Sequence, residues 1–185
     1  MKNPKPVYVQ VNLNNSLHQV KINKSFKCGD PVIDHYLRSG NLKRAVNSEN
    51  LHATAVCNEH YDVVGFMTVG FSQLAANRVK TPKGNQPKML AVAKVFMIGI
   101  DQAHQGKGLG TDLMLEAFEK AVAVHLHMPL KGIFLDAAPG KASFYATVFG
   151  FKALDADCIG PNGTTPMFIP IENVIAALME VSDLA

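Results

Sequence analysis

Hydrophobic and polar positions along the chain predict strands before and around two main helices. Near the N-terminus four apolar residues alternate with polar ones and predict a half-buried strand: Val7, Val9, Val11 and Leu13. Two β-rich runs, residues 51–57 and 61–71, flank Asn58-Glu59-His60 and predict a hairpin. A longer, largely apolar run over residues 89–100 predicts a further strand, in which Lys94 is the charged residue.

Helical spacing appears in several segments. Asp30 followed by Pro31 is typical of a helix start, and Ile33, Tyr36 and Leu37 then share one face. After residue 110 a single apolar stripe recurs at helical spacing: Leu113, Met114, Ala117, Phe118, Ala121 and Val122. Residues 142–149 predict a short helix that ends at Gly150, and residues 172–181 predict a terminal helix.

The remaining segments complete a mixed α/β pattern. Residues 132–138, 151–154 and 166–170 predict short strands, and the Pro- and Lys-containing residues 77–88 predict a loop. Strands on both sides of helices favour a mixed α/β sheet with helices on its faces. At 185 residues, without repeats or linkers, the chain is expected to form one domain over residues 1–185.

Charge is distributed unevenly although the net charge is only +3. Residues 1–100 carry 13 basic and 5 acidic residues, whereas residues 101–185 carry 5 basic and 10 acidic ones. A basic half can bind an anionic partner such as a nucleic acid, or it can simply keep a surface solvated. The candidate contacts are Lys21, Lys24, Lys27, Arg38, Lys43, Arg44, Arg78, Lys80, Lys83 and Lys88.

Cysteine usage and hydropathy point to a reducing compartment. Cys28, Cys57 and Cys158 are widely spaced, form no metal-ligand pattern and are expected to be reduced thiols. No apolar run approaches the roughly 20 residues of a membrane span, and the first residues lack a signal-peptide core. The chain is therefore expected in the cytoplasm, with no membrane partner and no metal.

The most informative segment joins the strand over residues 89–100 to the following helix through Gln105-Gly106-Lys107-Gly108-Leu109-Gly110. A glycine-rich loop at a helix N-terminus gathers backbone N–H groups at the positive end of the helix dipole and favours phosphate. The spacing lacks the GxxxxGK[ST] of a P-loop and the GxGxxG of dinucleotide-binding proteins. Nucleotide hydrolysis and dinucleotide binding are therefore disfavoured.

Two motifs resemble the GNAT acetyltransferase superfamily. Gln105, Gly108 and Gly110 fit the family's Q/R-x-x-G-x-G/A loop after a strand. Ala142-Ser143-Phe144-Tyr145 with Gly150-Phe151 resembles the family's A-x-x-F-Y…G-F segment. The resemblance implies the GNAT fold, a mixed and mostly antiparallel splayed sheet flanked by helices, and acetyl-CoA as co-substrate.

In that fold the loop N–H groups would hold the CoA pyrophosphate, and the strand ending at Ile100 would offer backbone groups to the pantetheine arm. The expected cofactor-binding residues are Ile98, Gly99, Ile100, Gln105, Gly106, Lys107, Gly108, Leu109, Gly110, Thr111 and Phe144.

The resemblance makes Tyr145 the candidate catalytic residue, because a phenol is protonated at neutral pH and can protonate the departing thiolate. The family spacing is F-Y-x-x-x-G-F, and this chain has one extra residue between Tyr145 and Gly150. An extra residue near Phe149 leaves Tyr145 in register, whereas an earlier one turns its hydroxyl by about 100°. No general base stands out: His104 is interpreted as a surface turn residue and Asp101 as a cap or brace for the loop.

The segment Ser25-Phe26-Lys27-Cys28-Gly29-Asp30-Pro31-Val32-Ile33-Asp34-His35-Tyr36-Leu37-Arg38 resembles the F-x-C-G-x-x-x-L-D-x-Y-L segment of GNAT toxins from bacterial toxin–antitoxin modules. That resemblance implies acetylation of the α-amine of aminoacyl-tRNA, a ribbon-helix-helix antitoxin partner, and compatibility with a homodimer. Toxins of this group often carry R-L-A-V-D before the loop, and here Met97 replaces the arginine.

Two alternatives stay open at this point. One is a GNAT N-acetyltransferase of a small amine or a protein N-terminus, for which the basic half would be incidental. The other is a GNAT domain that binds acetyl-CoA or a partner protein without catalysis.

Overall fold

The computed structural model describes residues 6–79, 87–154 and 159–183, which form two compact units. One unit comprises the chain up to Val69 together with Met97–Met114, and the other comprises Gly70–Phe96 and the chain from Leu115 onward.

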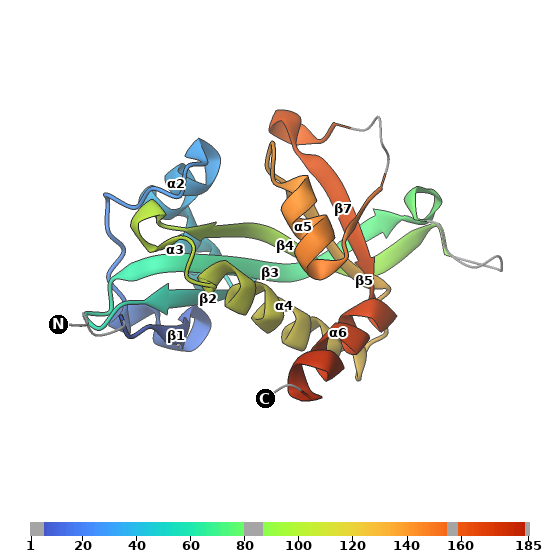
Figure 1. Ribbon diagram of the computed structural model, residues 1–185, viewed down its shortest axis with the longest axis horizontal. Helices are drawn as coiled ribbons and strands as arrows, with labels where there is room; N and C mark the ends of the chain where they lie inside the picture. The colour runs from blue at the N-terminus through green and yellow to red at the C-terminus, as the bar shows by residue number, and fades with distance from the viewer. Residues whose placement is uncertain (1–5, 80–86, 155–158, 184–185) are drawn as a thin grey trace. The chain divides into compact units, whose positions relative to one another are not determined.

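Among these residues seven strands form one hydrogen-bonded sheet (Figure 1). They are β1 (Val9–Asn12), β2 (His52–Cys57), β3 (Val63–Ala75), β4 (Met89–Ile100), β5 (Gly132–Ala137), β6 (Lys152–Ala153) and β7 (Thr165–Pro170). Their order is β1-β2-β3-β4-β5-β7-β6, with β4 and β5 parallel and the pairs β1–β2, β2–β3, β5–β7 and β6–β7 antiparallel. The predicted mixed, mostly antiparallel sheet is confirmed.

The helices of the described residues are α1 (Leu13–Ser16), α2 (Pro31–Arg38), α3 (Asn41–Asn47), α4 (Leu109–His125), α5 (Ala142–Phe149) and α6 (Ile171–Asp183). Short 3₁₀ turns are η1 (Leu17–Gln19), η2 (Ala76–Arg78), η3 (Gln102–His104) and η4 (Pro161–Gly163). The predicted stripe of α4 is confirmed, since five of its six apolar residues are buried and Val122 is half-buried. Sequence reasoning missed α1 and α3, because these helices have only 4 and 7 residues and are too short to show a clear hydrophobic period.

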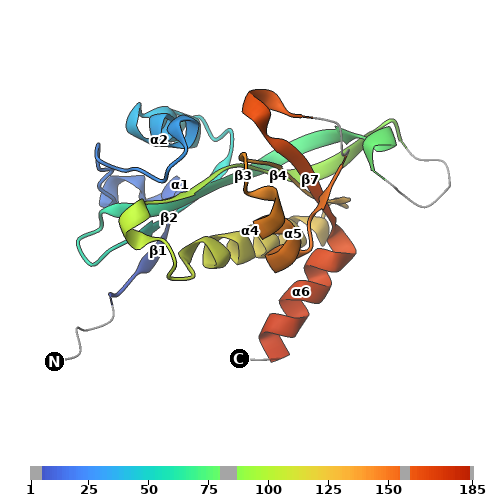
Figure 2. The same ribbon diagram turned by 45° about the horizontal axis from the view of Figure 1, so that its top comes forward.

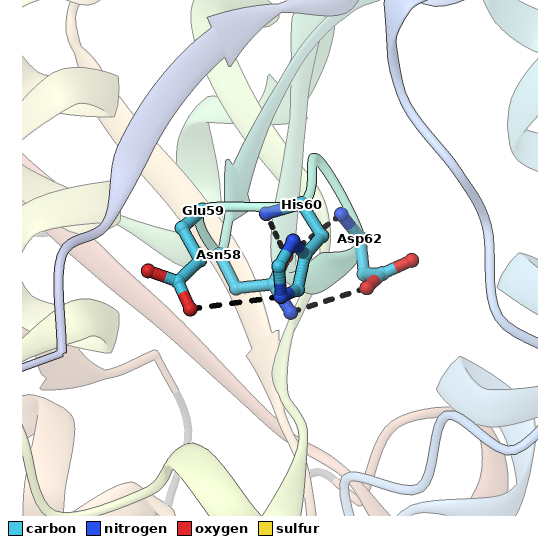
Figure 3. Close-up of polar contacts among 4 residues, drawn as sticks. All are labelled: Asn58, Glu59, His60 and Asp62. Atoms are coloured by element: carbon cyan, nitrogen blue, oxygen red, sulfur yellow. Dashed lines mark hydrogen bonds and ion pairs between the residues drawn. The ribbon is translucent and has the colours of Figure 1, made fainter.

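The predicted hairpin between β2 and β3 is confirmed, and one side chain holds its turn (Figure 3). The Asn58 side-chain oxygen accepts from the backbone N–H groups of His60 at 2.9 Å and Asp62 at 3.0 Å. Its amide nitrogen donates to the Asp62 carboxylate at 3.2 Å. The Asn58 side chain thus supplies the hydrogen bonds that hold the turn, as asparagine commonly does. Within this turn Tyr61 has a φ of +60°.

The N-terminal strand is shorter than predicted. β1 covers Val9–Asn12 at one edge of the sheet, and Leu13 already begins α1. Val11 and Leu13 are buried, but Val7 and Val9 are exposed. The predicted alternation was therefore wrong for the first two valines, because an edge strand that has only just begun to pair covers little apolar surface on either face.

Helices α2 and α3 pack against each other, and buried residues of both belong to the core of the first unit. Asp30 is the N-cap of α2, as predicted, and its carboxylate accepts from Val32 N at 2.8 Å. Leu37 and Leu42 are fully buried in this core, and the half-buried Ile33 and Tyr36 pack against it.

In the second unit β5 pairs along its whole length with β7. Helix α6, which directly follows β7 (Figure 2), contacts both strands. The parallel register of β4 with β5 covers Ala93–Val95 and Ile133–Leu135, although β4 continues to Ile100. Lys94 on β4 forms an ion pair with Asp136 at 2.8 Å, and its ammonium lies 4.8 Å from the centre of the Phe134 ring. The charge in this apolar strand is therefore neutralised by its neighbour.

Candidate functional site

The loop between β4 and α4 has the geometry of an anion-binding nest. Gly106 and Gly108 have φ of +73° and +83°, and a Cβ at either position would meet no protein atom within 4 Å. Among the described residues, the N–H groups of Gly106, Lys107 and Gly108 have no protein acceptor. The first N–H groups of α4, which begins at Leu109, are also free of intrahelical partners. An open concave backbone thus presents several donors at the positive end of a helix dipole.

Asp101 braces this loop, as the sequence predicted. One carboxylate oxygen caps η3 by accepting from Ala103 N at 3.0 Å, and the other accepts from Lys27 N at 3.0 Å. Gln102 N donates to Lys27 O at 2.8 Å, which closes a second link to the same segment. The start of the loop is therefore fastened to the chain just before α2.

Gln105 fastens the next part of the loop. Its side-chain amide nitrogen donates to Cys28 O and to Ile100 O, both at 2.9 Å. Because the side-chain nitrogen is engaged with the protein, we expect Gln105 to contact a ligand through its backbone. The Ile100 carbonyl, predicted to be available to a ligand, already accepts one hydrogen bond.

The segment resembling GNAT toxins supplies the other half of this brace. The buried Asp34 carboxylate accepts from Cys28 N at 2.7 Å, and a methyl group at Gly99 would lie 2.8 Å from Ile33 Cγ2. Phe26 is buried and meets the Phe66 ring edge-on at a centroid distance of 5.9 Å. These residues pack the N-terminal segment closely against the end of β4 and so position the loop.

Sequence reasoning missed one residue near the loop, Tyr8. Its hydroxyl lies 2.9 Å from His104 Nδ1 and accepts from Lys107 Nζ at 3.0 Å. His104, interpreted as a surface turn residue, is in fact half-buried and hydrogen-bonded. No sequence signal could have found this cluster, since Tyr8 lies 96 residues from His104 and outside every motif.

Several other predicted ligand residues of the loop have a packing role as well. Leu109 is buried, and a methyl group at Gly65 would overlap the side chain of Ile100. Gly110 leaves more room, since a Cβ there would lie 3.8 Å from Ile100 Cγ1. The half-exposed Thr111 lies in the first turn of α4.

In the second unit, Tyr145 lies on α5 within a group of aromatic rings. It faces Phe149 and Phe151 at centroid distances of 6.4 and 6.1 Å, and Phe144 at 5.4 Å. Burial raises the pKa of Tyr145 to about 12, so its hydroxyl keeps its proton at neutral pH. The hydroxyl makes no hydrogen bond to another residue that the structure describes.

Helix α5 contains no bulge from Ala142 to Phe149, and it ends at Gly150 in the left-handed conformation, as predicted. Tyr145 and Phe149 are four positions apart and therefore share one face of the helix. The extra residue before Gly150 is thus absorbed as regular helix. Phe144 is 42% exposed, which leaves its ring accessible.

Three of the basic residues gather around one cavity in the first unit. Lys24, Arg38 and Lys43 line a cavity of about 270 Å³, whose other walls include Leu17, Val20, Ile22 and Leu37. None of the three cations forms an ion pair with another described residue. Lys80 and Lys83 of the predicted basic set lie outside the described residues.

Cys28 and Cys57 are free thiols, and Cys158 lies outside the described residues. Within the described part of the chain, no three His, Cys, Asp or Glu side chains converge as metal ligands. No helix of that part has both the length and the apolar character required to cross a membrane.

Known proteins of similar sequence or fold include bacterial toxins. A tRNA-acetylating toxin of Mycobacterium tuberculosis is 27% identical over 134 residues, which cover 72% of this chain and 80% of that protein. A bacterial toxin of known crystal structure is 30% identical, with a TM-score of 0.84 over 95% of this chain and 97% of that one. A Tyr-to-Phe mutant of the toxin AtaT, bound to the C-terminus of the antitoxin AtaR and to acetyl-CoA, shares the fold. It is 20% identical, with a TM-score of 0.71 over 92% of this chain and 97% of that one.

The family model of GNAT acetyltransferases matches residues 27–151, which include the loop, its N-terminal brace and Tyr145. The chain therefore belongs to the GNAT acetyltransferase family.

Proposed function

We propose that this protein is an acetyl-CoA-dependent N-acetyltransferase that acetylates the α-amine of aminoacyl-tRNA and thereby acts as a toxin that blocks translation. The observation that carries the proposal is the open nest of N–H groups between β4 and α4 in a chain of the GNAT family. The M. tuberculosis relative, named as a tRNA-acetylating toxin, supports the choice of acceptor.

In this proposal acetyl-CoA supplies the acetyl group as an activated thioester. The N–H groups from Gly106 to Thr111 hold the pyrophosphate, because glycine at 106 and 108 keeps side-chain atoms out of the nest. Ile98, Gly99 and Ile100 present backbone groups to the amides of the pantetheine arm, and Phe144 adds an accessible apolar ring. Gln105 orders the loop through its two carbonyl contacts.

Tyr145 is the proposed catalytic acid. Its protonated hydroxyl donates a hydrogen bond, and then its proton, to the sulfur as the thioester C–S bond breaks and the acceptor nitrogen bonds to the acetyl carbon. The proton that the nitrogen loses passes to water, and Tyr145 regains a proton from water. A phenol with a pKa of about 12 stays protonated throughout the physiological range, so its hydroxyl can donate this hydrogen bond at any physiological pH. No residue of this chain is assigned as general base.

The cations Lys24, Arg38 and Lys43 favour an RNA acceptor over a small amine, because unpaired basic groups attract phosphates. The structure of AtaT with the C-terminus of AtaR supports an antitoxin partner, which we expect to be a ribbon-helix-helix protein. We further propose that residues 1–185 form a single GNAT domain that works in the cytoplasm, and a homodimer is compatible with this assignment.

The proposal is tested by incubating the purified protein with acetyl-CoA and total charged tRNA, followed by mass spectrometry of the released aminoacyl groups. We expect N-acetylated amino acids from one or a few tRNA species, and none from Tyr145→Phe. Acetylated polyamine or peptide in parallel reactions, with no acetylated aminoacyl group, would instead identify a small-amine or N-terminal acetyltransferase. Binding of acetyl-CoA without any product would identify a non-catalytic domain.

A further inference from the structure

Tyr8, directly before β1, joins two side chains of the loop between β4 and α4. Its hydroxyl lies 2.9 Å from His104 Nδ1, and Lys107 Nζ donates to the same oxygen at 3.0 Å. Lys107 Nζ also lies 5.7 Å from the centre of the Tyr8 ring, and the rings of Tyr8 and His104 meet edge-on at 5.7 Å. Two side chains of the loop, His104 and Lys107, therefore contact the same tyrosine.

The direction of one of these hydrogen bonds follows from the chemistry of its donor. An ammonium group only donates, so the Tyr8 oxygen accepts from Lys107. Between the Tyr8 hydroxyl and His104 Nδ1, the imidazole tautomer decides which atom donates. The three side chains thus form a hydrogen-bonded chain from Lys107 through Tyr8 to His104.

Lys107 keeps binding capacity in this arrangement. Its ammonium has three N–H donors, of which one goes to Tyr8 and one to Ala103 O at 3.4 Å. The third remains available, and Lys107 itself lies between Gly106 and Gly108, whose backbone forms the open nest. An exposed lysine without such contacts would sample many rotamers and would lose that conformational entropy on binding an anion. The contacts with Tyr8 and Ala103 therefore reduce the entropic cost of binding.

We infer that Tyr8 is a positioning residue for the acetyl-CoA loop, because it holds the ammonium group of Lys107 beside the nest for a phosphate of the co-substrate. The inference rests on the proposed function. It assigns a role to a side chain before the first strand, outside the part of the chain that the family model matches. The phosphate is either one of the pyrophosphate pair or the 3′-phosphate of the ribose, both of which an ammonium binds in the same way.

The test compares Tyr8→Phe, which removes only the hydroxyl, with the intact protein in acetyl-CoA titrations and steady-state kinetics. We expect the Kd and KM for acetyl-CoA to rise about three- to tenfold, the effect of losing part of one charge-assisted hydrogen bond, with kcat unchanged. Tyr61→Phe is the matched control, because Tyr61 lies exposed at a turn of the same unit and should leave both constants unchanged.

A double-mutant cycle separates positioning from general stabilisation. Lys107→Met should weaken acetyl-CoA binding at least as much as Tyr8→Phe, and Tyr8→Phe should then add nothing in the Lys107→Met background. Additive effects, or an unchanged Kd for Tyr8→Phe, would overturn the inference. Absence of acetyl-CoA binding by the intact protein would instead contradict the proposed function itself.

Two further arms complete the design. The first arm measures the binding of 3′-dephospho-acetyl-CoA. If Lys107→Met no longer weakens binding of this analogue, Lys107 binds the 3′-phosphate. If Lys107→Met still weakens it, Lys107 binds the pyrophosphate. If Tyr8→Phe does not fold, His104→Gln and His104→Leu replace it, since a glutamine amide can form a hydrogen bond with the Tyr8 hydroxyl and leucine cannot. Weaker acetyl-CoA binding by the leucine variant alone supports the inference, and equal binding by the two variants overturns it.

Discussion

The side-chain amide of Gln105 donates to the carbonyl oxygen of Cys28 at 2.9 Å, so the loop after β4 is tied to the segment that leads into α2. The same nitrogen donates to Ile100 O at 2.9 Å. The glutamine of the family loop pattern therefore acts in this chain as an internal brace. It holds a loop that must expose unpaired N–H groups and would otherwise be free to rearrange.

Gln105→Met should loosen this brace while keeping the length of the side chain. We expect a loss of about 1–2 kcal/mol in the free energy of unfolding, since two carbonyl groups are left without their donor, and weaker binding of acetyl-CoA. Urea unfolding and calorimetric titration measure the two effects. Gln102→Met is the control on the same turn, and an equal loss from both variants would contradict the bracing role.

Gly108→Val should impair acetyl-CoA binding for two reasons, backbone strain at a φ of +83° and atoms placed in the open nest. Gly163→Val separates them, because Gly163 has a similar φ of +76° and only an ordinary contact nearby. Both variants should lose stability, by about 1–2 kcal/mol from the left-handed backbone, but only Gly108→Val should lose affinity. Unchanged affinity in calorimetry would remove the nest from the proposed site.

Gly99→Ala should destabilise the first unit, because the added methyl group would lie 2.8 Å from Ile33 Cγ2. We expect a cost of about 1–3 kcal/mol in thermal or urea unfolding, as in other overpacked sites. Ile33→Leu removes the Cγ2 branch, so the double variant should recover part of the loss. No recovery would show that another contact limits the space at Gly99.

Tyr145→Phe should lower kcat by about 10²–10⁴-fold, the usual contribution of a general acid, and leave acetyl-CoA binding intact. Quenched-flow or steady-state assays and calorimetry separate the two constants. Unchanged turnover would exclude Tyr145 from the mechanism.

The raised pKa of Tyr145 also predicts a change in alkaline stability. Below the ordinary tyrosine pKa of about 10, folded and unfolded chains both hold the proton, and its contribution is fully present. As pH rises toward 12, the unfolded chain releases the proton while the folded Tyr145 keeps it, so this part of the stability is lost. Phenolate absorbance should show one tyrosine that ionises last, and Tyr145→Phe should remove it.

Glutamine at Lys24, Arg38 or Lys43 should weaken binding of aminoacyl-tRNA. It should also reduce the salt dependence of that binding, by about one unit of slope for each phosphate that the variant no longer neutralises. Filter binding at several salt concentrations measures this slope. Lys152→Gln, an exposed lysine on β6 in the other unit, should leave it unchanged. If all four variants showed the same slope, the three cations that line the cavity would not contact the RNA.

Local sequence determined much of this protein. The strand over residues 89–100 appears with the predicted bounds, Asp30 caps α2, and Gly150 ends α5. These features follow from interactions within a few residues, such as side-chain capping, glycine conformations and periodic burial, which a sequence displays directly. The loop pattern likewise pointed to phosphate, because its chemistry resides in consecutive backbone groups.

Only the tertiary structure decided how that loop is held. The contacts of Gln105 with Cys28, and of Lys107 with Tyr8, join residues 77 and 99 positions apart. The packing of Gly99 against Ile33, and the gathering of three cations around one cavity, have the same origin. Such pairs leave no local signature, because each depends on where the sheet and α2 bring distant segments together, and that is fixed by burial of the shared core.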